Sequence, residues 1–416
     1  MTSATLESAV PAPPIFDEPP EERVINEAPV ALSDDAFVSE SRFAAVPPCP
    51  IPWRNPLRFV AWVTEIGFGL ISLFLFLSVL AALPLFNFLA LGYLLEAEGR
   101  VARTGKLRYC LPLLPLASRL GSIAVGVALW LIPVRWISDA AVDAAIIAPG
   151  SGIAGAWRIG AFLVSAAVSL HLILASSRGG SFGCFFRPLK NVLWLRRQFR
   201  EGDYWLTANA AVRDFFKSLQ IPAHFLLGLK GFAAAFIWLA IPTALFAVMQ
   251  DPSQPGQVIL TLVGGALLIP VLAWAPFLQA RLASERRFAA GFELRAIREA
   301  FRRTPISFQL SIVLLYALSL PLYLFKVAAL PRDAIWLETP IFIASIYPAR
   351  ILIGWAYGRA VRKTTRSWIL LQWTMRLLLA PLLAFYVFLL FFTPSIGAYG
   401  RRVLFEHHAL LLPAPF

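Results

Sequence analysis

One stretch of this sequence has the spacing of a serine nucleophile. Residues 179–183 read Gly-Gly-Ser-Phe-Gly and match the G-x-S-x-G pattern of serine hydrolases. That chemistry requires a strand-to-helix turn that exposes the serine, with an acid and a histidine supplied from elsewhere in the chain. Here the match follows a long apolar segment and Arg178, in a stretch where glycines are ordinary. The pattern therefore does not predict a hydrolase.

Four ionisable residues lie inside long apolar stretches, where a charge is costly unless it is paired or hydrated. They are Glu65, His171, Arg350 and Arg376. A pair of Glu65 with either arginine would be neutral. Two interpretations stay open: these residues line a route for a substrate or for protons, or they form structural bridges between helices and reach toward an interface.

The sequence gives no sign of a metal or cofactor site. The three cysteines, Cys49, Cys110 and Cys184, have no metal-ligand spacing, and the four histidines are scattered. Neither an H-E-x-x-H motif nor a phosphate-binding G-x-x-x-x-G-K pattern occurs. We expect no catalytic, cofactor-binding or metal-binding residues, and a protein that is not an enzyme.

The composition is that of a polytopic membrane protein. Of the 416 residues, 58% are hydrophobic and only 15% are charged, and the mean hydropathy is +0.69. Residues 1–50 hold nine acids and two arginines, so the formal net charge of +13 leaves a charge of +20 on the rest of the chain. Because this positive charge gathers in short loops, it indicates a membrane surface rather than a nucleic acid.

The apolar segments predict an all-α bundle of eight or nine membrane helices between residues 53 and 393. Residues 1–52 are expected to form a disordered acidic tail, and residues 394–416 a short tail after the last crossing. Residues 57–97 are roughly twice as long as one crossing of about 20 residues. We interpret them as a hairpin hinged near Pro84, with one crossing plus a re-entrant or surface helix as the alternative. The other expected crossings are residues 121–137, 156–176, 226–249, 257–279, 306–327, 341–357 and 368–392.

Two basic stretches are predicted to form amphipathic helices on the membrane surface. Residues 185–200 have apolar side chains at helical spacing, and residues 281–303 have a similar stripe. Their arginines are expected to face anionic phospholipids of the inner leaflet. These arginines are Arg196, Arg197 and Arg200 in the first stretch, and Arg295, Arg298, Arg302 and Arg303 in the second.

The distribution of Lys and Arg predicts the orientation in the plasma membrane. Four segments, 100–108, 178–217, 281–303 and 359–366, together carry twenty-three of these residues. The outer segments, counted with the adjoining ends of the crossings, carry six: Arg135, Arg158, Lys326, Arg332, Arg401 and Arg402. Basic loops stay on the cytoplasmic side. We therefore expect a cytoplasmic N-terminus and an extracytoplasmic C-terminus.

Small residues predict where helices approach closely. Gly354-x-x-x-Gly358 is a helix-contact pattern, and Gly152, Gly155 and Gly160 are also expected to allow close contact. The stretches LGYLLEAEGRVARTGKLR (91–108), LRAIREAFRRTP (294–305) and PARILIGWAYGRA (348–360) resemble those of a family of bacterial multi-pass membrane proteins of unknown function. The resemblance implies a membrane location and lends no activity. We expect a non-enzymatic factor that organises the membrane or contacts lipid, with unknown protein partners. The alternative is a transporter that uses the buried charges.

Overall fold

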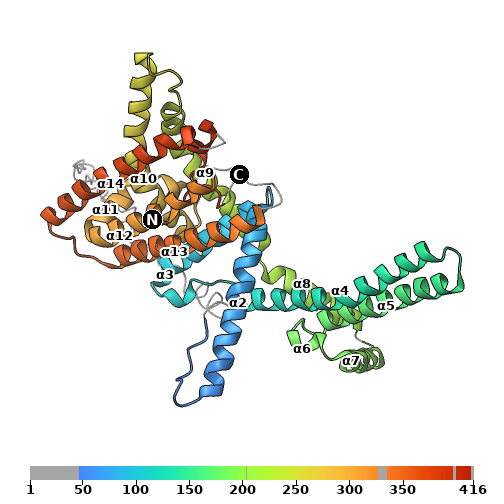
Figure 1. Ribbon diagram of the computed structural model, residues 1–416. Coiled ribbons are helices and arrows are strands. Elements are labelled where there is room, and N and C mark those ends of the chain that lie inside the picture. The colour runs from blue at the N-terminus through green and yellow to red at the C-terminus, as the bar shows by residue number, and fades with distance from the viewer. Residues whose placement is uncertain (1–45, 203, 327–334, 397–399, 414–416) are drawn as a thin grey trace, which may run out of the picture. The chain divides into compact units, whose positions relative to one another are not determined.

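The computed structural model describes residues 46–202, 204–326, 335–396 and 400–413. Within these ranges every regular element is helical (Figure 1). The α-helices are α2 (Pro56–Ala82), α3 (Asn87–Thr104), α4 (Leu114–Ile147), α5 (Gly152–Ser177), α6 (Phe182–Phe185), α7 (Pro188–Glu201), α8 (Tyr204–Ser218), α9 (Ile221–Phe246), α10 (Pro255–Glu285), α11 (Leu294–Arg303), α12 (Pro305–Ser319), α13 (Ile335–Arg362) and α14 (Ile369–Ile396). Short 3-10 helices are η1 (Leu107–Tyr109), η2 (Phe288–Phe292), η3 (Leu320–Lys326) and η5 (Gly400–Phe405).

Eight helical segments of the described chain are long and apolar enough to cross a membrane. They are Pro56–Ala82, Leu114–Ile147, Gly152–Ser177, Ala208–Phe246, Pro255–Glu285, Pro305–Phe325, Glu338–Arg362 and Ile369–Ile396. Many of their apolar side chains face outward: Ile132 on α4 is 62% exposed and Phe162 on α5 is 72% exposed. Such surfaces are stable in lipid and costly in water. The predicted all-α polytopic bundle is confirmed, and its spans contact the bilayer.

The apolar run at residues 57–97 forms two helices, with the break at residues 83–86 near Pro84 as expected. The second of them, α3, is unlike a lipid-facing helix, because it carries Glu96, Glu98, Arg100 and Arg103. Fourteen of its eighteen residues are buried. It packs against α2, α9, α10 and α13. The charged helix is therefore shielded by its neighbours, and it is not among the candidate spans. The described chain thus has one candidate crossing in residues 57–97, and not the two that the hairpin interpretation expects.

Close backbone contacts bind α3 to α13. A Cβ atom on Gly354 would overlap the carbonyl oxygen of Glu98, and one on Gly358 would overlap that of Ala102. The predicted helix-contact pattern is confirmed, and its partner is α3. Further along, Arg362 Nη1 donates to the Ala102 carbonyl at 3.1 Å. The contact moves from Glu98 to Ala102 on α3 as it moves from Gly354 to Gly358 on α13. The two helices therefore run parallel to each other.

The glycines of α5 do not make the close helix contacts that the sequence predicts. A Cβ atom added at Gly152, Gly155 or Gly160 would have no described atom within 4 Å. The expected close contact at these three positions is therefore wrong within the described chain. The helix α5 packs mainly along α4, and the two lie side by side in Figure 1.

The basic stretch 281–303 is not one helix. The helix α10 continues to Glu285, η2 follows, and α11 begins at Leu294. The apolar side chains of α11, Ile297 and Phe301, are buried in the protein core, with exposures of 0% and 1%. The expected apolar stripe exists, but it covers the protein interior rather than a membrane surface.

The chain after α14 also differs from the expected short tail. Residues 400–413, which we call the C-terminal segment, return to the bundle. Val403 and Leu410 are 0% and 1% exposed and belong to the main hydrophobic core. Hydropathy failed to predict this because the segment is too short for a crossing and its partners are distant in sequence. Residues 1–45 of the predicted acidic tail lie outside the described residues. Residues 46 and 47 are held by bonds from the Val46 amide to the Arg108 carbonyl and from Trp62 Nε1 to the Pro47 carbonyl.

Candidate functional site

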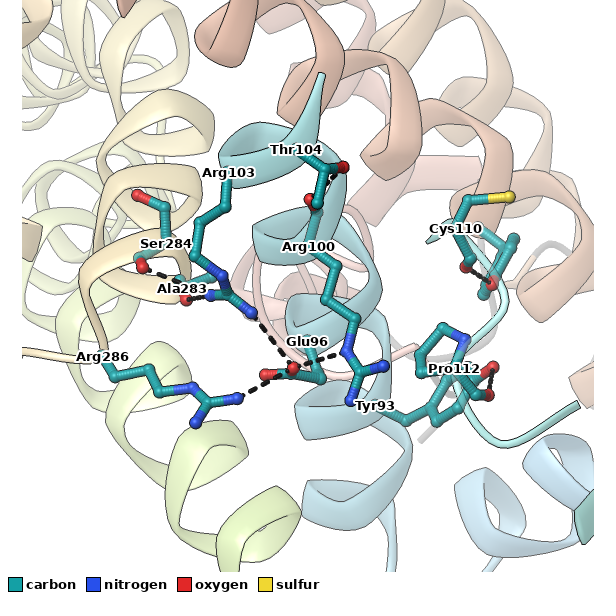
Figure 2. A network of polar contacts seen from close by, with 11 residues as sticks. Tyr93, Glu96, Arg100, Arg103, Thr104, Cys110, Pro112, Ala283, Ser284 and Arg286 are labelled. Atoms are coloured by element: carbon teal, nitrogen blue, oxygen red, sulfur yellow. Dashed lines mark hydrogen bonds and ion pairs between the residues drawn. The ribbon is translucent and has the colours of Figure 1, made fainter. Parts of the chain in front are cut away.

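Three arginines converge on one carboxylate oxygen at the centre of α3 (Figure 2). Glu96 Oε1 accepts from Arg100 Nε at 2.8 Å, from Arg103 Nη2 at 3.2 Å and from Arg286 Nη2 at 3.0 Å. The Glu96 side chain is 3% exposed, whereas Arg286 is 53% exposed. The pair Glu96 and Arg100 has the i,i+4 spacing of a helix face. The cluster carries one negative and three positive charges, so it is basic overall.

The same cluster connects α3 to the end of α10. Arg103 Nη1 donates to the carbonyl oxygens of Ala283 and Ser284 at 3.1 and 3.2 Å. These two carbonyls belong to the last turn of α10, where acceptors lack partners within the helix. Arg103 thereby satisfies them and fixes the two helix ends together, as Figure 2 shows.

A second acidic residue of α3 forms a separate ion pair. Glu98 Oε2 lies 3.1 Å from Arg350 Nη1 of α13, and the two side chains are 1% and 3% exposed. Their charges cancel. Arg350 Nη2 also donates to the carbonyl oxygens of Ala409 and Leu410 in the C-terminal segment, at 2.8 and 3.3 Å. Arg350 therefore joins α3, α13 and the C-terminal segment at one buried point.

Other side chains also hold the C-terminal segment in place. Gln279 Nε2 of α10 donates to the Leu410 carbonyl at 2.8 Å and to the Gly231 carbonyl of α9 at 3.0 Å. Thr243 Oγ1 lies 3.0 Å from His407 Nε2, and the Tyr323 hydroxyl donates to the Glu406 carbonyl at 3.0 Å. The segment is thus bound by α9, α10, α13 and η3.

The structure does not pair Glu65 with either predicted arginine. Glu65 is exposed on α2 and has no ion pair in the described chain. It lines a small pocket of about 90 Å³ with residues that include Val46 and Leu111. Arg376 of α14 lies over the rings of Phe301 and Trp373, at 5.3 and 5.4 Å. Because Arg350 pairs with Glu98, the proposed neutral pairs of Glu65 are wrong.

His171 belongs to a network of hydrogen bonds that connects α6 and α7 to α5. Its Nε2 lies 2.9 Å from the Phe185 carbonyl, and its Nδ1 lies 3.4 Å from Asn191 Nδ2. Asn191 also donates to the Cys184 carbonyl at 2.9 Å. Trp130 Nε1 donates to the same Phe185 carbonyl at 2.8 Å. The four predicted intramembrane residues therefore lie in four different environments, which does not favour one shared substrate route.

The arginines of the two predicted surface helices are mostly exposed. Those exposed to solvent or lipid are Arg196, Arg197 and Arg200 on α7 and Arg295, Arg298 and Arg302 on α11, whereas Arg303 is half-buried. On α7 they stand beside exposed apolar side chains, with Leu189 79% and Leu193 62% exposed. The inward face of α7 is formed by Asn191 and its neighbours, so this helix has an uncovered face that is both apolar and basic.

Sequence reasoning missed Glu96 and Glu98, the acids on which both buried networks depend. Their charge looked like the end of a membrane helix, since charge near an apolar run usually marks an interface. The i,i+4 spacing of Glu96 and Arg100, flanked by small residues, was the available signal. The described residues contain no group of three or more His, Cys, Asp or Glu that could hold a metal ion.

The fold and its polar networks define a multi-pass membrane protein. Comparison of the chain with protein-family models, with curated proteins and with solved structures finds no match. The resemblance to a family of bacterial membrane proteins therefore stays a prediction.

Proposed function

We propose that this protein is a non-enzymatic membrane factor that binds anionic phospholipid headgroups at its basic, cytoplasmic end. The observation that carries the proposal is the uncovered face of α7. There the exposed side chains of Leu189 and Leu193 stand beside those of Arg196, Arg197 and Arg200. Apolar side chains at this position enter the acyl boundary, while the arginines reach phosphate groups above it.

Contacts between the basic segments support a shared cytoplasmic side. Arg103 of segment 100–108 bonds to the end of α10, where segment 281–303 begins. Arg362 of segment 359–366 bonds to the Ala102 carbonyl, and Arg366 Nε donates to Glu299 at 2.9 Å. Three of the four segments predicted on the inner side therefore contact one another. Since α3 runs parallel to α13, this protein-covered helix brings the chain back to the same side after α2, although α3 is not itself a candidate span.

The buried charges support a structural role rather than transport. Glu96 and Glu98 are engaged by arginines, and Arg376 lies over aromatic rings. The exposed arginines of α7 and α11 lie outside these buried networks, and on α7 Arg197 also pairs with Glu201 at 2.8 Å.

Lipid selectivity of the reconstituted full chain tests this proposal. Electron paramagnetic resonance would measure the association of spin-labelled phosphatidylglycerol and phosphatidylcholine with the protein in phosphatidylcholine bilayers. We expect a preference for phosphatidylglycerol that falls in the triple variant R196Q/R197Q/R200Q, because each basic residue near an anionic surface contributes about 1 kcal/mol. The matched control R135Q/R158Q/R401Q removes three exposed arginines from the predicted outer side. Equal selectivity in the wild type and the α7 variant would overturn the proposal.

A further inference from the structure

The C-terminal segment is held in the way that a bound peptide is held. Its carbonyl oxygens at Glu406, Ala409 and Leu410 accept hydrogen bonds from side chains of the bundle. The donors are Tyr323, Gln279 and Arg350. Recognition of a main chain by fixed side chains is typical of peptide-binding sites.

The apolar side chains of the segment supply the rest of the contact. Val403, Leu404, Leu410 and Leu411 are between 0% and 8% exposed and belong to the main hydrophobic core. Full burial of an aliphatic side chain of this size contributes roughly 1.5–3 kcal/mol. Main-chain hydrogen bonds and apolar pockets therefore act together on this short stretch.

The polar groups around the segment have more hydrogen-bonding capacity than the segment uses. Gln279 Oε1, Glu98 Oε1 and Arg350 Nε are buried and have no hydrogen-bond partner among the described residues. A buried polar atom left unpaired costs about 1–3 kcal/mol. The fit of the resident segment is thus incomplete, and the groove still offers two acceptors and a donor to main-chain N–H and C=O groups.

The charge of this groove indicates the class of ligand. Glu98 neutralises Arg350 at 3.1 Å, so an anion gains little there. The atoms that Arg350 does contact in the segment are neutral carbonyl oxygens. A neutral, apolar chain with amide groups fits these properties better than a lipid phosphate.

We propose that the groove lined by Thr243, Gln279, Tyr323 and Arg350 is a binding site for an apolar peptide, and that the C-terminal segment is its resident, exchangeable ligand. This site is separate from the lipid-contacting arginines, and it does not depend on them. The occupant of the site is the C-terminal segment of the same chain, residues 400–413.

Peptide exchange in the intact, folded protein tests this inference. A protease site is inserted between Ile396 and Gly400, and the protein is folded, placed in nanodiscs and then cleaved. A fluorescein-labelled peptide of residues 400–416 is added, and its fluorescence anisotropy is followed. We expect binding to the cleaved protein and little binding to the uncleaved one, because a tethered segment competes at a local concentration that reaches the millimolar range. An excess of unlabelled peptide should displace the labelled one.

Two variants separate this site from non-specific adsorption. Gln279→Leu removes a donor to the Leu410 carbonyl and should weaken peptide binding roughly five- to tenfold, since one such bond contributes about 1 kcal/mol. Gln309→Leu on α12 makes the same change away from the segment and should leave binding unaltered. A peptide with Leu410→Asp should not bind, which tests the site even if a protein variant fails to fold.

Three outcomes would overturn the inference. Absence of exchange after cleavage would make the segment a permanent part of the core. Equal binding to cleaved and uncleaved protein would place the peptide elsewhere. Equal affinity of the Gln279→Leu and Gln309→Leu proteins would remove the assigned contact.

Discussion

Glu98 Oε2 on α3 lies 3.1 Å from Arg350 Nη1 on α13, and the two side chains are 1% and 3% exposed. This pair joins two parallel helices that are more than two hundred residues apart in the sequence, with a separation of 252. Desolvation of both charges is expensive, so the pair stabilises the fold only while both partners are present.

Replacement of one partner should therefore destabilise the protein strongly. We expect Glu98→Gln to lower the free energy of unfolding by about 3–5 kcal/mol, because Arg350 is left buried without a counter-charge. Thermal unfolding in detergent, with the abundance of the protein in membranes, measures the effect. The control is Glu65→Gln, which removes an exposed carboxylate without an ion pair in the described chain.

A double replacement provides the converse test. Glu98→Leu with Arg350→Met removes both charges and should recover part of the stability lost in Glu98→Gln, since buried pairs exchange for apolar side chains at little cost. The recovery stays incomplete because the Ala409 carbonyl loses the hydrogen bond from Arg350. If Glu65→Gln destabilises the protein as much as Glu98→Gln does, the assignment of the structural pair to Glu98 is wrong.

The membrane helices could be predicted from the sequence, because a crossing needs about 20 apolar residues and such runs are visible without a structure. His171 and Arg350 were also found in this way, since both stand inside apolar runs and both are buried. Their partners could not be predicted. The position of Glu98 beside Arg350 depends on how α3 packs on α13, and no local pattern reports it.

The same limit explains the C-terminal segment and the two amphipathic stretches. The segment binds through distant Gln279 and Arg350, so its own sequence looks like a short apolar tail. The stripes on α7 and α11 look alike in sequence. Only the fold shows that Ile297 and Phe301 of α11 are buried, whereas Leu189 of α7 is exposed.

The glycine contacts between α3 and α13 should be sensitive to a single methyl group. Gly358→Ala would place a Cβ atom against the carbonyl oxygen of Ala102, so the two helices must separate. We expect a loss of about 1–3 kcal/mol, which is typical of an overpacked interior. In Gly155→Ala on α5 the added Cβ atom has no described atom within 4 Å, so this variant serves as the control. Thermal unfolding of the two proteins distinguishes them, and equal melting temperatures would contradict the close contact.

The proposed orientation gives a direct prediction for reporter fusions. Fusions at Gly202 should report the cytoplasm, whereas fusions at Gln254 and at the C-terminus should report the outer side, because basic segments stay inside. A reporter pair that is active on opposite sides of the membrane provides the measurement. An outer signal at Gly202 would contradict the orientation.

Docking of the C-terminal segment should weaken at low pH through His407. Burial lowers the pKa of His407 to about 4, whereas an exposed histidine titrates near pH 6.5. Between about pH 4 and pH 6.5, His407 is therefore protonated in the released segment and neutral in the docked segment. Docking is strongest above about pH 6.5, and it weakens by roughly two orders of magnitude as the pH falls toward 4.

Hydrogen exchange of residues 400–413 in the intact chain measures this dependence. The amides should exchange faster, relative to the intrinsic rate, as the pH is lowered from 7 to 4.5. His407→Gln should remove most of the change, because glutamine does not titrate. Glu406 is the neighbouring residue in the chain, so Glu406→Gln is the matched control and should keep the pH dependence. Protection that is constant across this range in the wild-type protein would show that His407 titrates equally in the docked and released segment.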